Sequence, residues 1–258
     1  MPDRSSHPAG AFSYAELATS DLDAARSFYS RLFGWEFHDS PLPMGGVYSM
    51  AKLRGRTAAA AFAAPPEQGP PHWNSYVTVA SVDEIAERAA GLGATVVAPP
   101  FDVLESGRMT VVQDPSGAFV NFWEARADIG AEVVNEHGSL TWNELATRDP
   151  EAALSFYRDL LGWEFSRIPQ APFPMWAITL GGRGNGSLRQ MGAETPADVP
   201  PHWLAYFAVD DVEAAVRAAQ EGGGTVHVPP MDVPAGRFAV LADPQGAAFA
   251  VFAGQLDD

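Results

Sequence analysis

The sequence predicts an α+β fold of two tandem domains, each built from two βαβββ units. Segments 12–37 and 140–165 align without gaps and are identical at 15 of 26 positions, which marks a duplicated structural unit. The length of 258 residues suits two domains, since domains of about 125 residues are common. Within each half, the expected order of one strand, one helix and three strands also occurs twice.

The first unit begins with an apolar strand at 12–19. Asp21 is expected to cap a helix whose apolar residues recur at i, i+3 and i+4 spacing, and Gly34 is expected to end it. In the second half, Asp149 and Gly162 repeat this start and this end. Three short strands should follow the first helix, at 35–39, 47–53 and 57–63.

The second unit begins at a strand predicted over 75–80. Ser81 and Glu84 form the pattern of a capping box that opens a second helix, and Gly91 and Gly93 should close it. Three further strands are expected near 95–98, 108–113 and 118–124. The second half repeats this order, which places the domains at 11–125 and 139–253 with a linker at 126–138.

Composition excludes several classes of function. The net charge of −16 argues against a nucleic acid or an anionic membrane as partner. The absence of cysteine removes thiol catalysis, disulfides and Cys-ligated metals. No segment has the roughly 18 apolar residues of a membrane span, and residues 1–10 lack the apolar stretch of a signal peptide. A cytoplasmic protein is therefore expected.

Two βαβββ units side by side should curl into a half-barrel whose open face forms a cup for a small molecule. Alternation along the strands places Tyr14 with Glu16 on the cup face of the first domain. It places Trp142 with Glu144 at the same position of the second domain.

The repeated motifs resemble the vicinal oxygen chelate superfamily, which includes glyoxalase I, extradiol dioxygenases, and fosfomycin and bleomycin resistance proteins. The motifs are T-x-D-x-x-A-A-x-x-F-Y, then L-F-G-W, then V-x-x-V-D and D-P-x-G. The signature of both halves is similar to a two-domain actinobacterial branch described as glyoxalase-like. The resemblance implies two packed domains that mirror the homodimers of single-domain relatives, and further dimerisation of the chain stays open.

The same resemblance implies three positions for metal ligands in each cup. In the first domain they are Tyr14, Asn74 and Asn121, and in the second Trp142, Leu204 and Ala250. None of the six is a histidine or a carboxylate, the donors that such octahedral sites use. The sequence therefore predicts no metal and no cofactor.

Two repeated features have alternative interpretations. Glu16 and Glu144 are either ligand-binding groups or partners of a repeated arginine, for which Arg108 and Arg237 are candidates. The histidines of the repeated Pro-Pro-His-Trp segment, at 72 and 202, either act as bases at the cup rim or help to pack the loop at the domain junction. His7 is expected in a disordered tail.

The predicted function is metal-independent binding of an aromatic or cationic metabolite or antibiotic, similar to sequestration by bleomycin resistance proteins. The negative charge would speed capture of a cation. The candidate ligand-binding residues are Tyr14, Glu16, Tyr48, Asn74, Asn121, Trp123, Trp142, Glu144, Trp176 and Tyr206. The alternative is a glyoxalase or dioxygenase-type enzyme, or a metal-free lyase or isomerase, with Glu16 as general base and Tyr14 or Asn74 polarising a carbonyl. A third alternative is a structural or interaction protein without a ligand.

Overall fold

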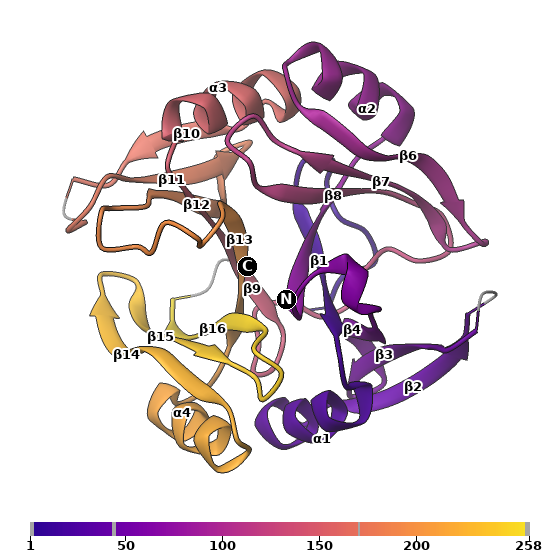
Figure 1. The fold of residues 1–258 in the computed structure, drawn as a ribbon, viewed down its shortest axis with the longest axis vertical. Coiled ribbons are helices and arrows are strands. Elements are labelled where there is room, and N and C mark those ends of the chain that lie inside the picture. The colour runs from indigo at the N-terminus through magenta and orange to yellow at the C-terminus, as the bar shows by residue number, and fades with distance from the viewer. Residues whose placement is uncertain (1–2, 43–44, 170, 256–258) are drawn as a thin grey trace.

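The computed structural model describes residues 3–42, 45–169 and 171–255. It contains two eight-stranded sheets, ordered β2-β3-β4-β1-β5-β8-β7-β6 and β10-β11-β12-β9-β13-β16-β15-β14 (Figure 1). The two orders are identical once the second set of strands is renumbered. The predicted α+β fold of two tandem domains is therefore confirmed.

Each half contains the same succession of elements. The first half comprises β1 (Phe12–Thr19), α1 (Leu22–Phe33), β2 (Glu36–Pro41), β3 (Val47–Leu53), β4 (Arg56–Ala63), a short 3-10 helix (Pro66–Gln68), β5 (His72–Thr78), α2 (Val82–Gly91), β6 (Thr95–Val103), β7 (Gly107–Gln113) and β8 (Phe119–Ala125). The second half comprises β9 (Leu140–Thr147), α3 (Pro150–Leu161), β10 (Glu164–Arg167), β11 (Met175–Leu180), β12 (Arg183–Gln190), β13 (His202–Ala208), α4 (Val212–Glu221), β14 (Thr225–Val233), β15 (Gly236–Ala242) and β16 (Ala248–Gly254).

The helix ends follow local sequence signals. The Asp21 side chain accepts a hydrogen bond from the backbone N–H of Ala24, and Gly34 ends α1 with a φ of 72°. Asp149 and Gly162 do the same for α3, where Gly162 has a φ of 71°. Glycine adopts this left-handed conformation without the steric cost of a Cβ atom.

One strand is longer than its sequence predicted. The expected strand at 95–98 continues as β6 to Val103, across Pro99 and Pro100. A proline removes one backbone donor, but β6 is the edge strand of its sheet, so that donor is not needed for pairing. The register with β7 shifts around the prolines, and β14 repeats this arrangement on the other sheet.

The faces opposite the cups form cores that join the two halves. One core combines α1 and the β1 region with α4 and β13, β15 and β16, and the other combines α2 and β8 with α3 and β9. Figure 1 accordingly shows α1 beside α4 and α2 beside α3. Neither half therefore buries its helices alone.

None of the helices within the described residues is long and apolar enough to cross a membrane.

Candidate functional site

The central strands of the first sheet bring four of the predicted ligand-binding residues together with Tyr76. Antiparallel pairing of β1 and β5 sets Tyr14 opposite Tyr76 and Glu16 opposite Asn74. Parallel pairing of β5 and β8 sets Tyr76 opposite Asn121. Because side chains on paired positions share a sheet face, these five residues line one cup. We call this group the Glu16 cluster, together with Tyr48 and Trp123, which extend it on β3 and β8.

Glu16 lies at the centre of this cluster and is 8% exposed. Its Oε2 atom accepts a hydrogen bond of 2.8 Å from the Tyr76 hydroxyl and one of 3.4 Å from Asn74 Nδ2. Burial raises the pKa of Glu16, while hydrogen bonds from Tyr76, Tyr48 and Asn74 oppose that rise. Among the described residues no lysine or arginine forms an ion pair with it. The carboxyl group is thus held by neutral donors alone.

Of the three tyrosines of the cluster, Tyr14 and Tyr76 are buried and Tyr48 is partly buried. Burial, followed by the nearby Glu16 carboxyl, raises the pKa of Tyr76 and of Tyr48 well above the ordinary value, so both remain protonated donors. The Tyr14 hydroxyl has no hydrogen bond of good geometry, although it lies close to Tyr48. A buried hydroxyl without a full partner is uncommon in native proteins. The cluster can therefore accept one further polar group.

The linker between the halves closes one end of this cup. Trp123 Nε1 donates to the carbonyl of Asp128 at 2.8 Å, and the backbone N–H of Ala131 donates to Ser13 at 2.8 Å. Ala131 and Val134 then pack against the cluster's aromatic rings. A ligand must therefore enter from elsewhere or displace this segment.

The second cup has the same shape but different chemistry. Glu144 is 6% exposed and forms an ion pair with Arg189, with 2.8 Å between Oε1 and Nε. Burial raises the pKa of Glu144, and Arg189, Ser187 and Tyr206 oppose that rise. Trp142 Nε1 donates to Ser187 Oγ at 3.0 Å. The second carboxyl thus already has the internal cation that Glu16 lacks.

Arg108 and Arg237 do not serve the buried glutamates, so the predicted ion pairs are wrong. Arg108 pairs with Asp83 and Asp102, and Arg237 pairs with Asp232 and Glu213. The next residues along these strands, Met109 and Phe238, pack in the cup clusters, so alternation places Arg108 and Arg237 on the opposite sheet face.

In each repeated His-Trp pair, the tryptophan is buried in a core and the histidine contacts the preceding proline-rich loop. The rings of Trp73 and Trp203 are buried in the two shared cores, where Trp73 packs on Phe207 of the other half. His72 Nδ1 lies 2.8 Å from the carbonyl oxygen of Pro70 at the cup rim, and His72 slightly offsets the raised pKa of Glu16. His202 repeats this contact with Pro200 at 2.9 Å.

Trp176 lies away from the second cup. It pairs with Leu188, a core residue on the opposite sheet face, and its ring packs against that core and beneath Arg167. The structure thus does not place Trp176 with Trp142, Glu144 and Tyr206.

Two functional neighbours were missed from the sequence. Tyr76 stands two residues beyond Asn74, so strand alternation would have placed it on the cup face. Arg189 stands two residues beyond Ser187, which pairs with Glu144. Arg189 could be identified as a neighbour of Glu144 only from the register between β9 and β12, which the sequence does not show.

The donors at the bottom of the cups do not fit a divalent metal. The described residues contain no cluster of three or more histidine, aspartate or glutamate side chains that would hold one. Around Glu16 the neighbours are phenols and amides, and Tyr76 and Asn74 already donate hydrogen bonds to its carboxyl. Manganese, iron and nickel favour imidazole and several carboxylates instead.

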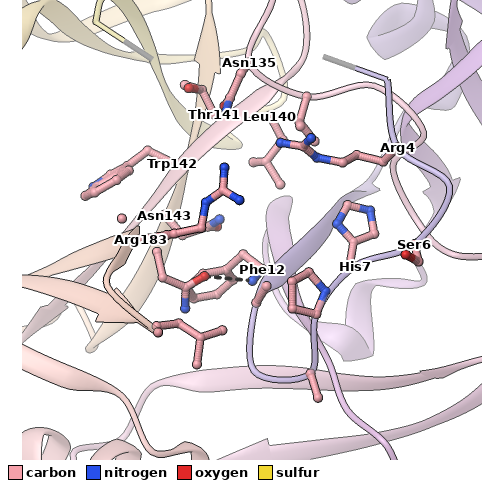
Figure 2. A pocket seen from close by; sticks show the side chains of 18 residues that line it. Arg4, Ser6, His7, Phe12, Asn135, Leu140, Thr141, Trp142, Asn143 and Arg183 are labelled. Carbon is pink, nitrogen blue, oxygen red and sulfur yellow. Dashed lines mark hydrogen bonds between the residues drawn. The ribbon is translucent and has the colours of Figure 1, made fainter. Parts of the chain in front are cut away.

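Glu16 lines neither of two cavities found in the described part of the chain. One, of about 630 Å³, lies between the N-terminal segment, the linker and the start of β9 (Figure 2). The other, of about 510 Å³, lies beyond the end of β1, beside the proline-rich loop before β5. Most side chains of the Glu16 cluster are buried, whereas Tyr48 and Asn74 are partly exposed.

The sequence matches the Glyoxalase/Bleomycin resistance protein/Dioxygenase superfamily over residues 11–122 and 139–251. The chain therefore belongs to this superfamily. It is 43% identical, over 97% of both chains, to a Mycobacterium tuberculosis protein named as a glyoxylase, CFP32. It is 35% identical to the anthracycline biosynthesis protein DauV of Streptomyces sp., with 94% of this chain and 92% of that protein covered.

Solved structures share the fold at low identity. The 2,3-dioxygenase LapB from Pseudomonas superposes with a TM-score of 0.69 at 15% identity, covering 97% of this chain and 95% of that one. The Mn(II)-bound glyoxalase from Novosphingobium aromaticivorans gives a TM-score of 0.69 at 16% identity, with 97% and 84% covered. These likenesses concern architecture alone.

Proposed function

We propose that the first cup binds a small aromatic molecule with a cationic or hydrogen-donating group, and that it does so without a metal ion. The observation that carries this proposal is the Glu16 carboxyl, buried among neutral donors and lacking the internal cation that Arg189 gives Glu144. A bound ammonium or N–H group would supply the missing partner.

The surrounding side chains support an aromatic ligand. Tyr14, Tyr76 and Trp123 present rings on the same cup face, and the first two meet edge to face at 5.9 Å. Such rings hold planar molecules and cations. Two relatives are named for anthracycline biosynthesis, and anthracyclines are planar aromatic compounds. The net charge of −16 would favour capture of a cation.

Calorimetric titration with 1-naphthylmethylamine tests the proposal. We expect binding to the wild-type protein that is unchanged by EDTA and at least about tenfold weaker in Glu16→Gln, because the amine loses a charged acceptor. The matched variant Glu144→Gln should bind as the wild type does, since Arg189 neutralises that carboxyl. Equal binding by Glu16→Gln and the wild type would refute the proposal.

A second candidate function is proton transfer by Glu16. Its raised pKa brings the carboxyl nearer to the range in which a general base works well at neutral pH. The relative named as a glyoxylase suggests a 2-oxoaldehyde as substrate, with Tyr14 or Asn74 polarising the carbonyl. Turnover of methylglyoxal in the presence of a thiol, lost in a folded Glu16→Gln variant, would favour this function. Retention of that turnover in the variant would exclude Glu16 as the base.

A further inference from the structure

The cavity of about 630 Å³ is separate from the Glu16 cluster and has its own chemistry. Three parts of the chain meet around it: residues 4–12, the linker near Asn135, and β9 with the β11–β12 hairpin. Its volume lies in the range of pockets that hold small organic molecules. Gly10 is tied to the hairpin because its carbonyl accepts from Asn185 Nδ2 at 3.0 Å, and the N–H of Phe12 donates back to Asn185 at 3.3 Å.

Among the described residues that line this cavity, the charged side chains are all basic. Figure 2 shows Arg4 and His7 on the N-terminal segment and Arg183 on β12 directed toward the same space. None of the described residues that line it is acidic, although the chain has 32 acidic and 16 basic residues. A wall of this composition runs against the average charge of the protein.

The N-terminal segment is ordered at this place. His7 Nε2 lies 2.7 Å from the carbonyl oxygen of Ala131, so the expectation of a disordered tail at His7 is wrong. Burial and the nearby Arg4 lower the pKa of His7. Arg4 and His7 thus both line the cavity and interact electrostatically.

The duplication explains why a cavity exists here. In the first half, the linker packs on the start of β1 through the Ala131–Ser13 hydrogen bond. The matching start of β9, at Thr141 and Trp142, instead borders the cavity. The cavity thus lies at the end of the second cup, where the first cup is closed by the linker.

We propose that this cavity is a second ligand site, and that it binds an aromatic carboxylate. The carboxylate would lie between Arg4 and Arg183, since guanidinium groups pair with carboxylates through two parallel hydrogen bonds. The Trp142 ring, at the side of the cavity in Figure 2, would pack on the aromatic part. Arg4 and Arg183 already make contacts within the protein, so the carboxylate joins or replaces them and binds with modest affinity.

Nuclear magnetic resonance with 2-naphthoate tests this proposal on the full chain. We expect saturable shifts of the His7 ring and Trp142 indole resonances, with an affinity at least about tenfold lower in Arg183→Gln and in Arg4→Gln. Arg217→Gln, on the exposed face of α4, serves as the matched control and should bind as the wild type does. Comparison of melting temperatures shows whether each variant is folded.

Two outcomes would overturn the proposal: no saturable shift in the wild type, or unchanged affinity in folded Arg183→Gln and Arg4→Gln. The Glu16→Gln variant separates this site from the proposed function, because it should keep 2-naphthoate binding while losing 1-naphthylmethylamine. If 1-naphthylmethylamine does not bind to the protein at all and 2-naphthoate binds as described, only the first-cup proposal is refuted.

Discussion

Equivalent glutamates in the two halves have different surroundings, and the difference in charge comes from one substitution between the repeats. Ser187 pairs with Glu144 as Ala60 pairs with Glu16, which sets Arg189 at the position of Phe62. An arginine neutralises a buried carboxyl, whereas a phenylalanine leaves it to neutral donors. Glu16 in the first cup therefore lacks the internal ion pair that Arg189 gives Glu144 in the second cup.

Glu16→Gln should stabilise the protein at neutral pH. Burial raises the pKa of Glu16 above 4.5, so the folded protein keeps this proton to a higher pH than the unfolded chain. The contribution of Glu16 to stability is therefore full at pH below 4.5 and falls as pH rises through the folded-state pKa. A gain of about 1 kcal/mol raises Tm by roughly 2–4 °C in a chain of this size.

Calorimetric Tm values from pH 4 to 8 check this expectation, because the advantage of Glu16→Gln should grow with pH and vanish near pH 4. Glu221→Gln, an exposed change at the end of α4, should show no such trend. A constant difference at every pH would mean that Glu16 is not the titrating group.

Purified protein should contain no stoichiometric metal. The family resemblance implies Tyr14, Asn74 and Asn121 as the metal-ligand positions of the first cup, and phenol and amide oxygens are weak ligands for Mn²⁺, Fe²⁺ or Ni²⁺. Elemental mass spectrometry after incubation with each ion and with Zn²⁺, followed by desalting, measures this directly. About one retained ion per chain would show that a different set of donors binds metal and would revive metal-dependent chemistry.

At the scale of single elements, the sequence predicted most of the fold because its signals are local. Asp21 and Gly34 mark the two ends of α1, and their repeats mark α3. The extension of β6 past Pro99 was not predictable, since it depends on the strand lying at a sheet edge. Likewise, the Arg189–Glu144 ion pair depends on pairing between strands far apart in sequence.

Close packing between β7 and β8 makes Gly107 intolerant of a side chain. A Cβ atom there would lie 2.5 Å from the Trp123 ring and 2.6 Å from the carbonyl oxygen of Glu124. We expect Gly107→Ala to lower the free energy of unfolding by about 1–3 kcal/mol, because backbone or ring must shift. Gly91→Ala is the control, since no atom lies within 4 Å of that Cβ and φ is not positive.

Urea unfolding measures both variants, and the Trp123 ring gives a second readout. If Gly107→Ala displaces this ring from the Glu16 cluster, binding of 1-naphthylmethylamine should weaken along with stability. A Gly107→Ala protein as stable as Gly91→Ala would show that β7 and β8 are less tightly packed than the structure indicates.

Across the whole molecule, the two halves are joined by matching hydrogen bonds as well as by shared cores. Tyr29 on α1 donates to Asp243 of the second half at 3.1 Å, and Tyr157 on α3 donates to Asp114 of the first half at 2.7 Å. Each hydroxyl also accepts from a buried tryptophan Nε1 of its own half. Both aspartates are turn residues before the last strand of a half, so each turn fixes the position of a helix in the other half.

Removing either tyrosine hydroxyl should therefore weaken the whole protein and not one half. Tyr29→Phe or Tyr157→Phe leaves a buried aspartate without one donor and a tryptophan N–H without its acceptor. We expect each change to cost about 1–3 kcal/mol. Burial raises the pKa of Asp114, and the hydrogen bond from Tyr157 partly offsets that rise. Without this hydrogen bond the ionised form of Asp114 is less stable in the folded protein, so the destabilisation by Tyr157→Phe should grow as pH rises.

The measurement is urea unfolding followed by tryptophan fluorescence and far-ultraviolet circular dichroism. Because each core contains residues of both halves, the two signals should change together in a single transition in both variants. Tyr14→Phe is the control, since its hydroxyl lacks a well-formed hydrogen bond and its removal should cost little. Two separate transitions in Tyr29→Phe or Tyr157→Phe would show that the halves fold independently. The shared cores would then form between domains that are already folded.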